Sequence, residues 1–273
     1  MASDGQSEVT LNDGRRMPQL GLGVWRTPAD DAARVVAAAL DAGYQAVDTA
    51  SAYKNEDGVG QALAGRDTFL TTKLWNDDQG YDEALRAFDA SAKRLGRDSV
   101  DLYLIHWPAP KKGRFVDSWK ALVRLQREGR AKSIGVSNFT EDHLTRIIDE
   151  TGVTPAVNQI ELHPRFQQTA LRAFHARHGI QTESWSPLGQ GQLLEDPALG
   201  DIARRTGKSP AQVIIRWHLD SGLIVIPKTV NPERLKQNIA VFDFALDAAA
   251  MEAIAGLDSP EGRIGPDPMT ATF

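Results

Sequence analysis

The sequence predicts an α/β protein built as a closed (β/α)8 barrel that is preceded by a short β-hairpin. Eight short apolar stretches alternate with amphipathic stretches along the 273 residues, and such alternation is typical of a parallel sheet with helices packed on it. Eight units in a chain of this length match a closed barrel. No linker, low-complexity tract or charge block interrupts the series, so residues 1–273 are predicted to form one domain.

The elements follow from the pattern of apolar, turn and capping residues. A tight turn at Asn12-Asp13-Gly14 joins the hairpin strands at 9–11 and 15–20. Strands are then expected at 19–25, 44–49, 68–73, 100–106, 131–138, 155–161, 180–187 and 223–228. Helices are expected at 28–43, 56–63, 81–96, 115–129, 141–152, 168–179, 196–207, 209–222 and 231–242. Pro28 near the start and Gly43 at the end bound the first of these helices.

The runner-up fold is a doubly wound dinucleotide-binding sheet. That fold needs a G-x-G-x-x-G turn between its first strand and helix. Gly21 and Gly23 supply two glycines, but Pro28 arrives before a third. The pattern therefore favours the barrel.

Composition narrows the class of protein. A net charge of −5 does not indicate a nucleic-acid binder, which usually carries a basic face. The absence of cysteine excludes disulfides, thiolate catalysis and cysteine-based metal sites. No apolar stretch is long enough to span a bilayer, and residues 1–21 contain no signal-like apolar run. The expectation is a cytoplasmic monomer without membrane or nucleic-acid partners.

Polar or ionisable side chains end three consecutive expected strands. Side chains alternate in direction along a strand. The sets expected to share a face are Tyr44, Ala46 and Asp48; Phe69, Thr71 and Lys73; and Leu102, Leu104 and His106. The carboxyl ends of barrel strands surround the active site of such folds, so Asp48, Lys73 and His106 are expected at one mouth with Tyr53 on the adjoining loop. Any one of these residues alone is more often a solvated strand end or a packing side chain.

The chemistry of these four residues is coherent. A phenol and an ammonium have ordinary pKa values of about 10 and 10.4. The ammonium of Lys73 is expected to lower the pKa of Tyr53, while Asp48 keeps Lys73 charged. Tyr53 would then donate a proton to a carbonyl oxygen that His106 also contacts. The sequence has no serine or cysteine nucleophile motif, so a nicotinamide hydride is expected to attack the carbon.

Aromatic and basic residues indicate where ligands lie. Four tryptophans directly follow expected strands, and they suit the walls of a substrate pocket: Trp25, Trp75, Trp107 and Trp185. The alternative is that these side chains plug the barrel. Three basic residues follow the last strand and suit an anionic ligand at a helix start, namely Lys228, Arg234 and Lys236. Lys236 also fits a solvated helix face. The six histidines include the pair His175 and His178, expected on an exposed face, and no metal site is predicted.

Seven motifs together resemble the aldo-keto reductase family, in particular its prokaryotic 2,5-diketo-D-gluconic acid reductase branch. They are AGYQAVDTASAYKNEDGVG, TTKLWN, VDLYLIHWP, GVSNF, VNQIELHP, ESWSPLGQG and IPKTVNPERL. The resemblance covers nearly the whole chain. It implies a (β/α)8 barrel whose base is capped by the N-terminal hairpin, an NADPH cofactor and a small carbonyl substrate.

The resemblance also implies roles for individual residues. Tyr53 would be the general acid, Lys73 and Asp48 would tune it, and His106 would orient the substrate. The residues implied to bind the cofactor are Gly23, Val24, Ser137, Asn138, Gln159, Trp185, Ser186, Leu188, Gln190, Lys228, Thr229, Arg234, Gln237 and Asn238. Among them, Lys228, Thr229 and Arg234 match the 2′-phosphate site that makes the family prefer NADPH. Trp25, Trp75 and Trp107 match substrate-pocket positions.

Some positions depart from the common family pattern. Lys54 adds a charge beside Tyr53, and Gln237 stands where a glutamate is common. The stretch 262–273 would be the variable C-terminal loop over the substrate, and Arg263 within it is considered as a partner for an acidic substrate. The candidate substrates are diketo acids, dicarbonyls such as methylglyoxal, and aldehydes. Two alternative functions are a Schiff-base lyase that uses Lys73 or Lys228 and a non-catalytic NADPH sensor.

Overall fold

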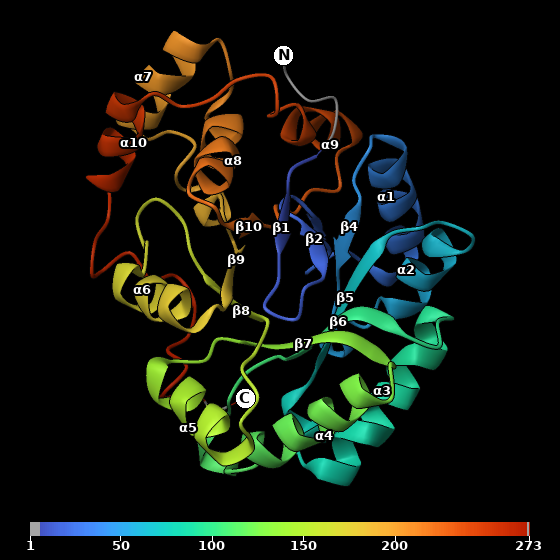
Figure 1. Ribbon diagram of the computed structural model, residues 1–273. Coiled ribbons are helices and arrows are strands. Elements are labelled where there is room, and N and C mark those ends of the chain that lie inside the picture. Colours follow the sequence, from blue (N-terminus) through green and yellow to red (C-terminus); the bar gives the residue numbers. More distant parts are fainter. Residues whose placement is uncertain (1–5, 272) are drawn as a thin grey trace.

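The computed structural model describes residues 6–271 and 273. Eight parallel strands form one sheet in chain order, surrounded by helices (Figure 1). Their bounds are β3 Leu22–Gly23, β4 Ala46–Asp48, β5 Phe69–Leu74, β6 Val100–Ile105, β7 Ala131–Ser137, β8 Val157–Glu161, β9 Gln181–Trp185 and β10 Ile224–Val225. The predicted α/β fold with eight parallel strands is confirmed.

The sheet closes between its first and last strands. A parallel bridge joins Leu20 to Val225, and the backbone N–H of Gly23 donates to Pro227 O at 3.2 Å. Gly23 is required at this seam, because a Cβ there would lie 2.8 Å from the carbonyl oxygen of Ile226. The closure leaves the barrel with no exposed sheet edge.

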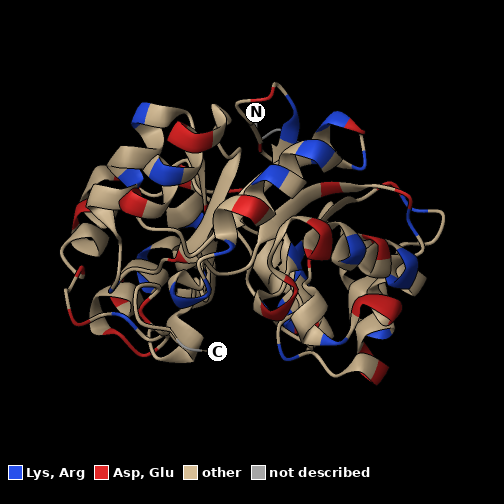
Figure 2. Cartoon of the chain, turned by 90° about the horizontal axis from the view of Figure 1, so that it is seen from below, with Lys and Arg blue, Asp and Glu red and all other residues tan. Residues whose placement is uncertain are grey.

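The N-terminal hairpin covers one end of the barrel. Its strands β1 Glu8–Thr10 and β2 Arg16–Pro18 pair antiparallel and lie over the centre of the barrel in Figure 1. Leu11 and Met17 of this hairpin region pack with interior residues such as Leu102 and Leu104. Basic and acidic residues are mixed over the outer helices (Figure 2).

Ten α-helices and four short 3-10 helices lie within the described residues. The α-helices are α1 Ala29–Asp41, α2 Glu56–Leu63, α3 Tyr81–Leu95, α4 Phe115–Arg127, α5 Glu141–Thr151, α6 Thr169–His178, α7 Pro197–Thr206, α8 Pro210–Asp220, α9 Pro232–Ile239 and α10 Ala248–Ala255. The 3-10 helices are η1 Ser51–Tyr53, η2 Asn76–Asp78, η3 Pro110–Lys112 and η4 Gly189–Gly191.

Local sequence explains where several helices begin. The Ser209 and Gln212 side chains form a capping box in front of α8, and the side chain of Asn231 caps α9 through the N–H groups of Glu233 and Arg234. Each such cap contributes about 1 kcal/mol. Asp247 caps α10 in the same way, although the sequence analysis predicted no helix there.

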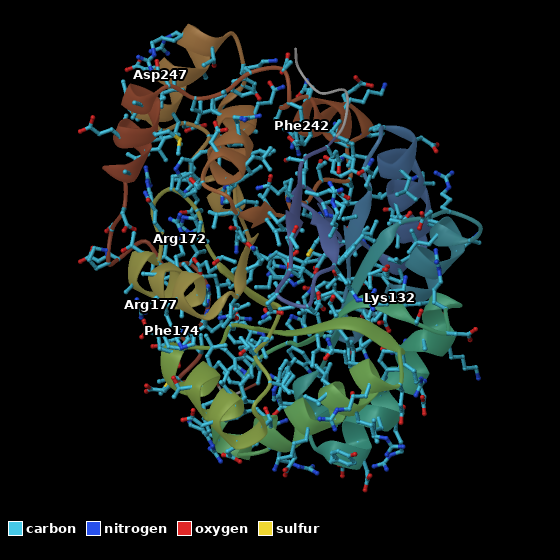
Figure 3. The ribbon with its side chains drawn as sticks, in the orientation of Figure 1. Lys132, Arg172, Phe174, Arg177, Phe242 and Asp247 are labelled. Carbon is cyan, nitrogen blue, oxygen red and sulfur yellow. The ribbon has the colours of Figure 1, made fainter. Side chains whose placement is uncertain are left out.

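Two expectations about side-chain direction are wrong. Tyr44 precedes β4 and does not share the inward face of Asp48, because its hydroxyl donates outward to Leu235 O of α9 at 3.2 Å. His175 is buried rather than exposed, since its ring contacts Asn158 at 2.9 Å and Thr182 at 2.8 Å. Both contacts lie on the barrel side of α6, whose Phe174 and Arg177 are labelled in Figure 3.

Candidate active site

The four predicted catalytic residues meet at the carboxyl end of the barrel. Asp48 ends β4, Lys73 lies near the end of β5, His106 follows β6 and Tyr53 ends η1. The Nζ atom of Lys73 lies 2.5 Å from Oδ1 of Asp48 and 5.2 Å from the centre of the Tyr53 ring. The Tyr53 and His106 rings are 5.6 Å apart in an edge-on arrangement.

Lys73 and Asp48 form a buried ion pair behind the phenol. Lys73 is fully buried and also donates to Thr49 O at 2.9 Å. The second carboxylate oxygen of Asp48 accepts a hydrogen bond from the Gln159 amide at 2.8 Å. The ammonium and the carboxylate are therefore held by several hydrogen bonds, as buried charges require.

The loop that carries Tyr53 is fixed by its neighbours. The Asn55 side chain donates to Val24 O at 3.0 Å and accepts from the Thr49 hydroxyl at 2.8 Å. Lys54 adopts a left-handed conformation with φ 59°, which turns the chain sharply after Tyr53. The loop therefore joins the ends of β3 and β4, and Tyr53 faces the cleft.

Burial and charge set the protonation states of these groups. Burial raises the pKa of Tyr53 above its ordinary value of 10.0, although Lys73 opposes it. The expectation that Lys73 leaves this pKa below its ordinary value is wrong for the protein alone, because burial outweighs the ammonium. Burial also works against a charged Lys73, but Asp48 and Tyr53 outweigh it and raise its pKa, so Lys73 remains an ammonium ion.

His106 is neutral at physiological pH. Burial, together with the charge of Lys73, holds its pKa well below the ordinary value of 6.5. Its Nδ1 atom has no hydrogen-bond partner among the described residues. A neutral imidazole at the cleft can donate one hydrogen bond to a ligand oxygen.

A cleft with a volume of about 1140 Å³ opens above these residues. Asp48, Tyr53 and His106 line it, while Lys73 lies behind them. All three predicted substrate tryptophans, Trp25, Trp75 and Trp107, line it as well, and Trp185 does too. The alternative that these tryptophans only plug the barrel does not fit this placement.

Eight of the residues expected at the cofactor line the cleft. They are Gly23, Ser137, Asn138, Gln159, Trp185, Ser186, Gln190 and Lys228. The indole N–H of Trp185 donates to Oδ1 of Asn138 at 2.8 Å, and the Asn138 amide donates to His106 O at 3.0 Å. These contacts hold the Trp185 ring as one wall of the cleft. Asn138, Ser186 and Gln190 have φ of 63°, 49° and 54°, so the loops around this wall are sharply turned.

The other six cofactor candidates lie outside the cleft lining. Val24 and Leu188 pack with the apolar core. The Thr229 hydroxyl accepts from Asn231 N at 3.2 Å, within the turn before α9. Arg234 and Gln237 are exposed on α9, and Asn238 is buried there. Lys236 pairs with Glu233 at 3.1 Å on the exposed face of α9, which agrees with the solvated alternative for this residue.

The C-terminal stretch, which the resemblance implies lies over the substrate, contributes residues to the cleft lining. Ile264, Gly265, Pro266 and Phe273 line the cleft. The Phe273 ring stacks on Trp75 at 5.9 Å and meets Trp107 edge-on at 5.0 Å, and the Asn76 amide donates to Phe273 O at 2.9 Å. The resemblance does not single out Phe273 within this loop, because the position of its ring depends on the path of the whole C-terminal stretch.

Glu161 anchors the start of this stretch. Its buried carboxylate accepts from the backbone N–H groups of Ile264 and Gly265 at 2.6 and 2.8 Å and contacts His163 at 3.1 Å. A Cβ on Gly265 would lie 2.5 Å from the Trp185 ring, so this position requires glycine. Arg263 lies outside the cleft, with its guanidinium 4.6 Å from the centre of the Phe166 ring. Its suggested contact with a substrate has no support.

Within 6–271 and 273, no group of three His, Cys, Asp or Glu side chains could hold a metal ion. In the same part of the chain, no helix has the length and apolar character needed to cross a membrane.

Known proteins provide an independent comparison. The model of the family described as "Aldo/keto reductase family" matches residues 17–259. An aldo-keto reductase of Mycolicibacterium smegmatis is 58% identical over 270 residues, which cover 97% of this chain and 98% of that protein. Methylglyoxal reductase DkgA of Escherichia coli is 52% identical over 267 residues, covering 95% and 96% of the two chains.

Solved structures of similar sequence have the same fold as this chain. A variant of Gox0644 in complex with NADPH is 58% identical, has a TM-score of 0.98, and the alignment covers 99% of this chain and 100% of that one. An aldo/keto reductase from Brucella melitensis is 57% identical with a TM-score of 0.90, covering 92% and 98%. The family resemblance and the capped barrel are confirmed. This chain belongs to the aldo/keto reductase family.

Proposed function

We propose that this aldo-keto reductase uses NADPH to reduce small aldehydes and ketones to alcohols at the Tyr53 cleft. The observation that carries the proposal is the arrangement of Tyr53, His106 and the buried Lys73–Asp48 pair at one end of an aromatic-walled cleft. The Gox0644 variant was solved with NADPH, and the relative DkgA is named methylglyoxal reductase.

The residues present fit a nicotinamide dinucleotide. Trp185 offers a planar wall held by Asn138, and Gln159 and Ser137 line the cleft beside it. Lys228 lies at the cleft with an exposed side chain, and it is followed by α9, which carries the exposed Arg234. Two cations near a helix N-terminus suit the 2′-phosphate that distinguishes NADPH from NADH. The bound cofactor would supply the hydride that adds to the carbonyl carbon.

The side chains at the cleft provide the proton and the orientation. Tyr53 donates its phenolic proton to the carbonyl oxygen as negative charge develops there. Neutral His106 donates a hydrogen bond to the same oxygen and fixes its direction. The Lys73 ammonium stabilises the phenolate that Tyr53 leaves behind, and Asp48 keeps the ammonium charged.

The cleft favours a small, polar carbonyl compound. Phe273 fills the space between Trp75 and Trp107, which limits the room for a bulky substituent. Arg26 and Lys54 line the cleft and offer positive charge to a keto acid, in a lining that also includes the acidic Asp57, Asp77 and Asp78. Methylglyoxal and keto acids similar to 2,5-diketo-D-gluconate are therefore the substrates proposed for testing.

The lyase alternative fits this arrangement poorly. A Schiff-base lysine must be neutral to attack a carbonyl, whereas Lys73 is fully buried in an ion pair of 2.5 Å and its pKa is raised. Borohydride reduction in the presence of a keto substrate would trap an adduct if either Lys73 or Lys228 formed one. Turnover with NADPH separates the reductase from a non-catalytic sensor.

The test replaces the proposed acid and keeps the cofactor site. Tyr53→Phe should lose at least about a hundredfold in kcat, because it removes the proton donor, while NADPH binding by fluorescence titration stays within a factor of two to three of wild type. Tyr81→Phe removes a phenol from the start of α3, outside the cleft lining, and should retain full activity. Full turnover of methylglyoxal by Tyr53→Phe would refute the role of Tyr53.

A further inference from the structure

Glu183 is a buried carboxyl group that the mechanism above does not use. It lies on β9 opposite Gln159 of β8 and Ile224 of β10. Its neighbour Thr182 contacts His175 of α6 on the outside of the barrel at 2.8 Å, so Glu183 points to the interior, on the same side as Trp185. Its side chain is completely buried.

The surroundings of Glu183 belong to the catalytic group. Gln159, its partner in register, donates to Oδ2 of Asp48 at 2.8 Å. The charges of Asp48 on β4 and Lys73 on β5 act on Glu183, and the charge of Glu183 acts in turn on Tyr53 of η1. Glu183 therefore lies in the interior of the barrel, within electrostatic reach of three of the four catalytic residues.

In the part of the chain that the structure describes, the buried carboxyl group of Glu183 lacks the hydrogen bonds that would stabilise its charge. Neither oxygen has a partner among residues 6–271 and 273. An ionised carboxylate without a partner is very unfavourable in a protein interior, so the geometry favours the protonated form. Burial, with Asp48, raises the pKa of Glu183 to about 8, although Gln159 and Lys73 oppose the shift.

We propose that Glu183 is a positioning residue that controls how strongly Lys73 acts on Tyr53. While Glu183 is neutral, the charge of Lys73 is balanced only by Asp48 and by the developing phenolate. When Glu183 loses its proton, a second carboxylate shares Lys73 and the phenolate of Tyr53 becomes less stable. This inference rests on the proposed role of Tyr53 as the group that exchanges the proton.

The sign of the effect distinguishes this role from packing. Alcohol oxidation, the reverse reaction, needs Tyr53 as phenolate to accept the alcohol proton. An ionised Glu183 raises the pKa of Tyr53, so it opposes oxidation at alkaline pH and has no effect at a pH where it stays protonated. A residue that only filled space would change activity equally at all pH values.

The experiment compares Glu183→Gln with wild type across pH. Gln keeps the size of the side chain and cannot ionise. We expect equal kcat/KM at about pH 6 for oxidation, by NADP+, of the alcohol formed from methylglyoxal. Above about pH 9 the variant should be about tenfold faster, because a nearby charge in a protein interior shifts a pKa by about one unit. Glu183→Asp, whose side chain can ionise, should again be slower in oxidation than Glu183→Gln above about pH 9.

Three controls separate the possible failures. Glu252→Gln makes the same chemical change on the exposed face of α10 and should leave the profile unchanged. NADPH titration of Glu183→Gln confirms that the site is folded. Infrared difference spectra between wild type and Glu183→Gln should show a protonated-carboxyl stretch at pH 6, which reports on Glu183 without any turnover.

Two outcomes would overturn the inference. One is an oxidation profile of Glu183→Gln that is parallel to wild type at every pH, and the other is the absence of a protonated-carboxyl band at pH 6. Failure of the proposed function has a different signature. In that case Tyr53→Phe retains turnover while the infrared band of Glu183 is still present.

Discussion

Replacing Glu183 by glutamine also has a consequence for stability that can be worked out from the structure. An ordinary glutamate has a pKa of 4.5, and burial raises that of Glu183 to about 8. Between these values the folded chain holds a proton that the unfolded chain has released. The contribution of Glu183 to the free energy of unfolding of wild type therefore falls as pH rises through this window, by about 1.36 kcal/mol per unit.

Glu183→Gln removes this proton uptake. Between about pH 5 and pH 7 the variant should gain about 3 kcal/mol relative to wild type, because only wild type must hold an extra proton in order to fold. The gain arises from the neutral side chain and does not need a new contact. Below about pH 4.5 the difference in free energy of unfolding between the variant and wild type should disappear, since Glu183 is then protonated in both the folded and the unfolded chain.

Urea denaturation at pH 5, 6, 7 and 8, followed by tryptophan fluorescence, measures this difference. The six tryptophans supply the signal, and the Glu252→Gln variant shows what a removed surface carboxyl does. If the unfolding free energies of wild type and Glu183→Gln stay parallel over this range, Glu183 is not held protonated and the reasoning fails.

Three further substitutions test other parts of the site. Asp48→Asn leaves the Lys73 ammonium buried without a counter-charge. It should lower the free energy of unfolding, measured in urea, by about 3 kcal/mol and should remove most of kcat. An unchanged free energy of unfolding would show that Asp48 does not balance the charge of Lys73. Lys228→Ala should reduce the preference for NADPH over NADH by about tenfold in Kd, since it removes a charge-assisted contact to the 2′-phosphate; a retained preference would place that phosphate elsewhere. Phe273→Ala opens the space beside Trp75 and should lower KM for bulkier aldehydes relative to methylglyoxal, whereas an equal change for all substrates would argue against a steric role.

Much of this site follows from periodicity in the sequence. Asp48, Lys73 and His106 come at or near the ends of consecutive expected strands and in phase with small or apolar residues, so a barrel must bring them to one mouth. Their convergence depends only on the period of the strands and on parallel pairing in chain order. For the same reason the four strand-following tryptophans line one cleft.

Local sequence patterns do not predict features that depend on tertiary packing, such as helix α10 and the burial of His175. The helix α10 was not predicted, although Asp247 caps it, because an alanine-rich stretch has no clear apolar face. His175 reads as a polar residue on a helix, yet two barrel side chains satisfy its ring and keep it buried. The partners that make a buried polar group acceptable are distant in sequence and cannot be read locally.

The sequence by itself determined the barrel, the family and the residues of the proposed acid site, because these depend on repeating patterns and on motifs that lie within single units. Only the tertiary structure decided the protonation of that site. Burial outweighs Lys73 in setting the pKa of Tyr53, and the buried Glu183 of β9 acts on the same phenol from across the barrel. It also decided that Phe273 closes the cleft against Trp75 and Trp107. The physical reason is that desolvation and charge coupling depend on distances between residues far apart in the chain.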